Sequence, residues 1–319
     1  MLRGLFNAIL AITFAFSSQA SGLLTIQLHS VGQNSTQYQV LFVADPSIGY
    51  ALEFATELST WQPIRGFPIT DSEIVIDSDF SSAEETLFFR LRQFSSDASF
   101  DVREGLVLEY RFDESEGDIA SDTSSSGLPG LLMGGAQWNN GYSGNGLLLD
   151  GVDDYVYVGD DDRIEVEFFT LCAWTKSDGE TIDPLRQEIL EKADSYWLNI
   201  RNDSRLVRTG GFFGDCSVRQ EWFFADSHIQ VEFGKWIHIA STYDGVSLRI
   251  FVNGELVSTR LVDRPICNDR DKLLVIGAKK EYDETPEVAQ FSGMLDEVRI
   301  YNRPLSQSEI IAVMHAVTR

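Results

Sequence analysis

The sequence predicts an all-β protein with two sandwich units and one short helix near its C-terminal end. Its 319 residues exceed the length of about 100 to 200 residues that is usual for a single domain. Apolar residues alternate in short runs that Gly, Asn, Asp and Ser interrupt, and helical periodicity is nearly absent before residue 306. These features favour sheets packed on sheets.

The first twenty residues have the pattern of a secretory signal peptide. Arg3 precedes the apolar stretch 5–16, and Ser18-Gln19-Ala20 has the small residues of a cleavage site. We therefore expect residues 1–20 to be removed and the mature protein to be secreted, periplasmic or at the cell surface. No later stretch is apolar over the length that spans a bilayer, so the cleaved chain is expected to be soluble.

Residues 22–94 are expected to form a small β-sandwich module. Five stretches read as strands: "LLTIQLHSV", "YQVLFVA", "YALEFAT", "SEIVID" and "TLFFRLRQF". "YALEFATELSTWQPI" with "FFRLRQF" resembles a β-sandwich unit of exported bacterial proteins, although Trp61, Phe88 and Phe89 would also be needed simply to fill so small a core. Residues 95–104, "SSDASFDVRE", are polar and are predicted to be a linker.

Residues 105–319 are predicted to form the larger domain. The pairs Asp244-Gly245 and Asn253-Gly254 predict tight hairpin turns because these residue types accept positive φ, and "VSLRIFV" between them alternates as one strand. After Pro304, Ser306 and Glu309 form a capping box, and apolar residues repeat along one face of the helix that follows.

The order of motifs in this domain resembles the laminin-G-like, concanavalin A-like jelly roll family. The motifs are "GLVLEYRFDESEGD", "SDTSSSGLPG", "SGNGLLLDGVDDYVYVGD", "FTLCAWTKSD", "KWIHIASTYDGVSLRIFVNGELV", "LLVIGA" and "FSGMLDEVRIYNRPLSQSEI". The resemblance implies a concanavalin A-like jelly roll sandwich: two antiparallel sheets face to face, one of them concave, and a short helix at the end.

The resemblance also places the acidic stretch "DGVDDYVYVGDDD", residues 150–162. In the family, "LDGVDDYV" is a strand, a tight turn and a second strand, so Asp153 and Asp154 are expected in the turn, where Asp side chains cap backbone amides. The residues at 160–162 are expected in a solvated loop, with a cation there as the alternative.

A structural calcium ion is implied by the family between a loop near the start of the domain and the closing strand. The matching residues are Asp122 and Asp296, with Asp113 as a third candidate, and loop carbonyls and water could complete the six to eight oxygens that Ca²⁺ takes. The loop at Asp122 is longer than the family's, however. An Asx turn at Asp122 and a salt bridge from Asp296 to Arg299 or a neighbour is the alternative.

The three cysteines lack the short spacings of a zinc site. Because the chain carries an export signal, we expect one pair to be oxidised. Cys216 and Cys267 lie in polar, turn-like surroundings and are the predicted disulfide, whereas Cys172 in "FTLCAW" is predicted to be an inert core thiol.

Composition argues against some classes of partner and reaction. A formal net charge of −24 repels nucleic acid and anionic membranes. The sequence lacks an H-E-x-x-H zinc motif, a G-x-S-x-G elbow and the Glu-x-Asp-x-x-Glu pattern expected of a glycosidase with this architecture. His238 in "WIHIAS" occupies a family position where packing is expected. We therefore predict that the protein is not an enzyme.

One strand suggests a carbohydrate site. In "SYWLNIR", Tyr196, Leu198 and Ile200 alternate toward the core, which sends a flat ring, an amide and a guanidinium to the other face: Trp197, Asn199 and Arg201. "EWFFAD" could add Trp222 and Phe224 to that face. The alternative is that loops cover this surface and bury the rings.

The sequence thus predicts an exported, non-catalytic binding or adhesion protein whose jelly roll recognises a glycan or a glycosylated partner. A protein-binding module of the cell envelope is the first alternative, and a glycoside hydrolase is the second. A converging carboxylate pair in a cleft would favour the hydrolase.

Overall fold

The structure is a computed structural model. Backbone and side chains are described for residues 101–179, 181–214, 222–262, 264–268, 272–280 and 288–316; before residue 95, the backbone of six strands is described. The expected signal peptide, Trp61 and Cys216 lie outside these ranges. The chain divides into two compact units, residues 1–100 with 311–317 and residues 101–310 with 318–319.

The first unit holds two small antiparallel sheets. One has the order β1 (Leu23–Ser30), β2 (Thr36–Val43) and β5 (Glu73–Ile76); the other has the order β4 (Gln62–Pro63), β3 (Gly49–Ala55) and β6 (Phe88–Phe94). Each of the five stretches that the sequence predicts as strands overlaps one of these strands, and β4 lies outside all five.

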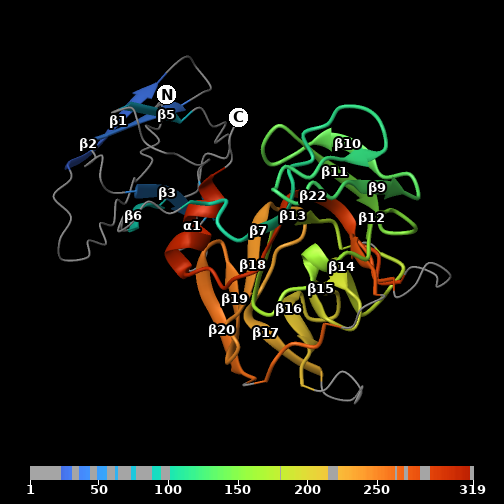
Figure 1. The fold of residues 1–319 in the computed structure, drawn as a ribbon. Helices are drawn as coiled ribbons and strands as arrows, with labels where there is room; N and C mark the ends of the chain where they lie inside the picture. The colour runs from blue at the N-terminus through green and yellow to red at the C-terminus, as the bar shows by residue number, and fades with distance from the viewer. Residues whose placement is uncertain are drawn as a thin grey trace. The chain divides into compact units, whose positions relative to one another are not determined.

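The second unit is a sandwich of two eight-stranded antiparallel sheets (Figure 1). The order of the first sheet is β10 (Gln137–Asn140), β11 (Asn145–Asp150), β22 (Ser292–Tyr301), β13 (Phe169–Ser177), β18 (Ile237–Tyr243), β19 (Ser247–Val252) and β20 (Glu255–Leu261), and β7 (Leu106–Tyr110) pairs with β22. The order of the second is β17 (Trp222–Gln230), β16 (Leu206–Phe212), β15 (Tyr196–Arg201), β14 (Arg186–Lys192), β21 (Leu274–Ile276), β12 (Tyr155–Gly159), β9 (Gly130–Met133) and β8 (Ile119–Ala120). The predicted jelly roll sandwich is confirmed.

Turn residues fix this topology locally. Asn253 and Gly254 have φ of 48° and 76° and join β19 to β20, as the predicted hairpin requires. Between β18 and β19, the Asp244 carboxylate accepts the amides of Val246 at 3.0 Å and Ser247 at 2.7 Å. Both predicted hairpin turns are therefore present.

Every second side chain along the strands points between the two sheets and fills the core. Tyr196, Leu198 and Ile200 of β15 are fully buried and belong to the main core cluster, which draws Ile239 and Ile250 from the facing sheet. The predicted inward face of this strand is confirmed, and the opposite face of the same sheet is called the outer face below.

In the described part of the chain there is one α-helix, α1 (Gln307–His315). It begins where the sequence predicts. The Ser306 amide donates to the Glu309 carboxylate at 2.6 Å, and the Glu309 amide donates to the Ser306 hydroxyl at 3.3 Å. The capping box is confirmed.

Candidate functional site

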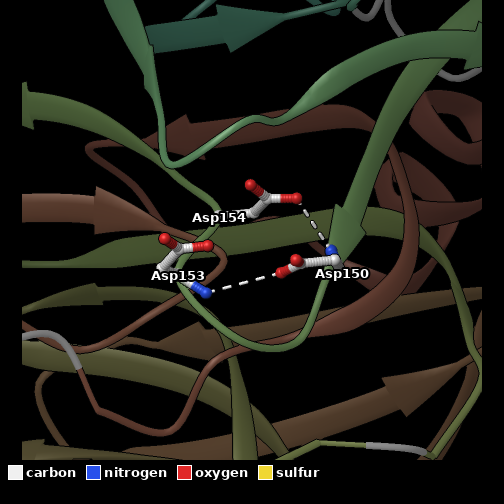
Figure 2. Close-up of side chains that lie close together, drawn as sticks. All are labelled: Asp150, Asp153 and Asp154. Carbon is white, nitrogen blue, oxygen red and sulfur yellow. Dashed lines mark hydrogen bonds between the residues drawn. The ribbon is translucent and has the colours of Figure 1, made fainter.

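The aspartates after β11 build the turn into β12 (Figure 2). Asp150 Oδ1 accepts the amides of Val152 at 2.8 Å and Asp153 at 3.4 Å, and Asp154 Oδ2 accepts the amide of Asp150 at 2.9 Å. The expected capping is confirmed for Asp154, whereas the second acceptor is Asp150 in place of Asp153. The three carboxylates each place an oxygen within 4.8 Å of the others, so they are residues that could hold a hard cation.

Two of the three following aspartates, Asp160 and Asp161, also have side-chain partners. Asp160 lies 3.1 Å from the buried Lys192 Nζ, and Asp161 is the N-cap of the 3₁₀ turn η1 (Asp162–Ile164). Hydrogen bonds from Arg163 lower the pKa of Asp161 to about 2. These contacts explain the stretch without a bound cation.

Asp122 does not fit the calcium site that the family implies. Its Oδ1 accepts the amides of Glu109 and Ser124, at 2.9 and 2.8 Å. Its Oδ2 accepts the Ser124 hydroxyl at 2.8 Å and the Leu128 amide at 2.9 Å. Four donors fill the lone-pair sites of this carboxylate, which leaves none for a cation. The alternative, an Asx turn, describes Asp122.

Asp296 has a different environment. It is fully buried, its Oδ2 accepts the amide of Ser143 at 2.9 Å, and its Oδ1 has no hydrogen-bond partner in the described chain. Burial raises the pKa of Asp296 to about 8. Arg299, named in the alternative as a salt-bridge partner of Asp296, instead contacts Glu109 at 2.7 Å and Glu297, so that part of the alternative is wrong. Asp113, the third candidate, pairs with Arg111 at 3.0 Å.

An aromatic row crosses the outer face of the second sheet. Trp197 of β15 lies opposite Gly210 of β16, which lies opposite Phe224 of β17. A Cβ on Gly210 would lie 2.4 Å from Cζ2 of Trp197, so the missing side chain is what lets the indole lie across β16.

Two further rings complete this row into an aromatic platform, defined here as Trp197, Phe212, Trp222 and Phe224. Phe212 and Trp222 are stacked, with ring centroids 6.2 Å apart and planes 8° apart. The rings of Trp197 and Trp222 meet edge to face, with centroids 6.3 Å apart. Trp222 is 59% exposed, which makes it the open part of the platform.

The predicted carbohydrate residues divide between this platform and the covered part of the sheet. All four lie on the predicted face, but Trp197 is 7% exposed and Asn199 is 1% exposed. The alternative that this surface is covered therefore describes both. Arg201 is engaged by Asp203 at 2.8 Å. Trp222 alone among the four presents a large open surface.

A polar row runs beside the aromatic one. Register places Glu188 of β14, Asn199 of β15, Arg208 of β16 and Asp226 of β17 side by side. Arg208 donates twice to Asp226, at 2.6 and 2.7 Å, and its guanidinium lies 4.1 Å from the ring centroid of Phe224. This ion pair is partly exposed and adjoins the platform, which adds directed donors and acceptors to it.

Two carboxylates that the sequence did not single out meet on the same face. Glu188 and Glu191 are three residues apart on β14, and a register shift between Glu188 and Leu190 turns both to the outer face. Glu188 lies 2.7 Å from Arg186 Nε, and Glu191 lies 2.6 Å from Lys279 Nζ. Burial, aided by the charge of Glu191, raises the pKa of Glu188 to about 8.

The remaining predictions concern cysteine and histidine. Cys172 is a buried free thiol whose pKa burial raises to about 12, as expected of an inert core residue. Cys267 is buried, and the 216–267 disulfide stays a prediction because Cys216 lies outside the described residues. His238 is fully buried and meets the Trp174 ring edge-on at 5.4 Å, in the packing position expected.

The comparisons with known proteins agree with this fold. A family model described as the concanavalin A-like lectin/glucanases superfamily matches residues 150–311. Among curated proteins, no sequence matches the chain. In the described part of the chain, no helix is long and apolar enough to cross a membrane.

Several solved structures are similar at low identity. The binding domain of Paraclostridial Mosquitocidal Protein 1 is 16% identical, with a TM-score of 0.53, over 67% of this chain and 52% of that one. The receptor binding domain of botulinum neurotoxin mosaic serotype C/D is 19% identical, with a TM-score of 0.51, over 67% and 51%. The chain thus spans about half the length of these two. Domain 4 of AbnA, an extracellular arabinanase from Geobacillus stearothermophilus solved with arabinotriose, is 18% identical, with a TM-score of 0.48, over 65% and 97%.

Proposed function

Because the chain belongs to the concanavalin A-like lectin/glucanases superfamily, we propose that it is an exported, non-catalytic protein that binds a glycan or a glycosylated partner. The aromatic platform is the proposed contact surface. The single observation that carries the proposal is the stacked Phe212–Trp222 pair, of which Trp222 is 59% exposed.

The chemistry of the platform suits a saccharide. A sugar ring has an apolar face that can lie on an indole and hydroxyl groups at its rim that need partners. The Arg208–Asp226 pair supplies both donors and acceptors beside Phe224. The cation–π contact between Arg208 and the Phe224 ring holds the guanidinium in place. An apolar surface with a few directed polar groups is typical of small-ligand sites.

Binding without hydrolysis is favoured by the state of the carboxylate pair. Glu188 and Glu191 are 1% and 3% exposed, and each contacts a basic group, Arg186 or Lys279. A glycosidase needs one carboxyl group free to donate a proton and the other free to attack or to activate water. The raised pKa of Glu188 would suit a proton donor, but Lys279 holds the charge of Glu191, which competes with attack on the sugar and with activation of water.

The test is an array of glycans and polysaccharides probed with residues 21–319, in calcium and again in chelator. For a glycan that binds, Trp222→Ala is expected to weaken the affinity about tenfold, or about 1.4 kcal/mol, because the stacking surface is lost. Leu261→Ala is the matched control, since Leu261 is a 72% exposed apolar residue on the other sheet. A blank array in both buffers, or equal losses in the two variants, would reject the proposal.

A second candidate is a protein-binding module of the cell envelope. It is favoured by exposed apolar side chains on β20, the edge strand of the first sheet. Leu256 is 47% exposed and Leu261 is 72% exposed. Exposed apolar side chains on a strand at a sheet edge favour association with another chain. A blank glycan array would make this the leading function.

A further inference from the structure

The outer face holds two buried acceptor atoms that the aromatic platform does not use. Glu188 Oε2 and Asn199 Oδ1 have no hydrogen-bond partner in the described chain, and both residues are 1% exposed. The two residues are cross-strand neighbours in register, and Asn199 Nδ2 donates to Glu188 Oε1 at 3.1 Å. Buried acceptors without donors cost free energy, so this position favours a ligand that brings donors.

The charges around these atoms select the kind of donor. Arg186 contacts Glu188 and Lys279 contacts Glu191, so the two basic groups balance the two carboxylates when both are ionised, and the raised pKa of Glu188 lowers the negative charge further. A cation would add an uncompensated charge to this buried cluster, whereas a neutral hydroxyl group would not. Hydroxyl groups are therefore the donors that fit.

The two basic side chains that contact the carboxylates reach solvent. The side chains of Arg186 and Lys279 are 29% and 21% exposed, while Glu188 and Glu191 are buried. Rotamer changes of such partly exposed side chains are fast and need no movement of the backbone. Contact between a ligand and Glu188 requires Arg186 to swing outward.

The position of these acceptors relative to the platform sets the size of the ligand. Trp222 lies two strands away from Asn199 and, by register, about four residues along the strand direction. With about 4.8 Å between strands and about 3.3 Å per residue, the two points are roughly 16 Å apart. Arg208 and Asp226 continue the polar row from Asn199 across β16 to β17, where Phe224 belongs to the platform.

We propose that Glu188 and Asn199 form a hydroxyl-binding subsite that extends the aromatic platform, so that the ligand is a chain of neutral sugars rather than a single sugar. The inference rests on the proposed function and specifies its ligand class. The platform binds one part of the oligosaccharide by stacking, and the subsite accepts hydrogen bonds from the hydroxyl groups of a sugar unit further along it.

The experiment compares chain lengths. Affinities for two-unit and six-unit oligosaccharides are measured by calorimetry, with the cello-, xylo- and manno- series as the first probes. Asn199→Ala and Glu188→Gln are each expected to weaken binding of the six-unit sugar about fivefold and to leave the two-unit sugar unchanged, since each removes one acceptor. Trp222→Ala should weaken both.

A further variant guards against loss of the fold. Arg186→Ala removes the side chain that contacts Glu188 and keeps both acceptors, so six-unit binding should be retained or tightened. Melting temperatures report the fold of every variant. Equal effects on both lengths, or none, while the parent protein binds, would overturn the subsite and leave the proposed function standing. No binding of any sugar by the parent protein would overturn both.

Discussion

Asp296 is the residue whose burial has the clearest consequence for stability. Its folded-state pKa of about 8 lies above its ordinary value of 3.8, because the carboxyl is buried. Between these values the folded state holds a proton that the unfolded state releases. Stability contributed by the neutral form is therefore lost as the pH rises through this window, and the penalty is complete above about pH 8.

The change that tests this is Asp296→Asn. The amide oxygen can still accept the Ser143 amide, and the side chain no longer ionises. We expect the variant to gain stability relative to the parent as the pH rises from 4 to 9, by about 5 kcal/mol at the upper end, because each pKa unit corresponds to about 1.4 kcal/mol. Urea unfolding across this range measures the difference. A constant difference at every pH would contradict the assignment.

Single residues also show what could be predicted of the site. Alternation in "SYWLNIR" correctly predicts the face of Trp197 and Asn199, because strand periodicity is local. It does not predict their burial, which depends on Phe212, Trp222 and Glu188 from other strands. The pairing of Glu188 with Glu191 is not predictable from their spacing, because side chains three apart on a regular strand point to opposite faces.

At the scale of the element, β16 is shaped by one glycine. A Cβ on Gly210 would lie 2.4 Å from Cζ2 of Trp197 and 2.5 Å from the carbonyl oxygen of Phe223. We expect Gly210→Ala to destabilise the protein by about 1–3 kcal/mol, because the indole and β17 must both move. Thermal unfolding measures the loss, and near-ultraviolet circular dichroism reports the displaced indole.

A double-mutant cycle assigns this effect. Trp197→Phe replaces the indole by a smaller ring, so part of the stability lost in Gly210→Ala should return when the two changes are combined. Strict additivity of the two single effects would mean that the glycine is needed for the strand backbone and not for the platform.

The bulge in β14 is a feature that could not be predicted from the sequence. It falls between Glu188 and Leu190 and turns two carboxylates to one face, yet "RQEILEK" contains no glycine or proline that would mark it. The hairpin turns are the opposite case. Asn253-Gly254 is recognisable because positive φ restricts the residue types, so the adjoining strands could be predicted.

At the scale of the whole molecule, the fold was predictable and the site was not. The jelly roll follows from ordered motifs and local turn chemistry, and a family model over residues 150–311 agrees with it. The site depends on residues brought together from distant strands. Lys279 and Glu191 are 88 residues apart in sequence, and Arg208 and Asp226 are 18 apart. Neither pairing has a signal in the local pattern of residues.

The net charge of −24 sets up a negative field over the whole surface. A neutral oligosaccharide has no charge to interact with this field, so its affinity should change less than about twofold between low and high salt, where the Debye length falls from about 30 Å at 0.01 M to about 3 Å at 1 M. A sulfated polysaccharide should be repelled at low salt. Calorimetry with both ligands across this range measures the dependence. An affinity for the neutral sugar that falls steeply with salt would mean that a charged contact carries the binding, and Arg208 or Lys279 would replace the aromatic platform as its source.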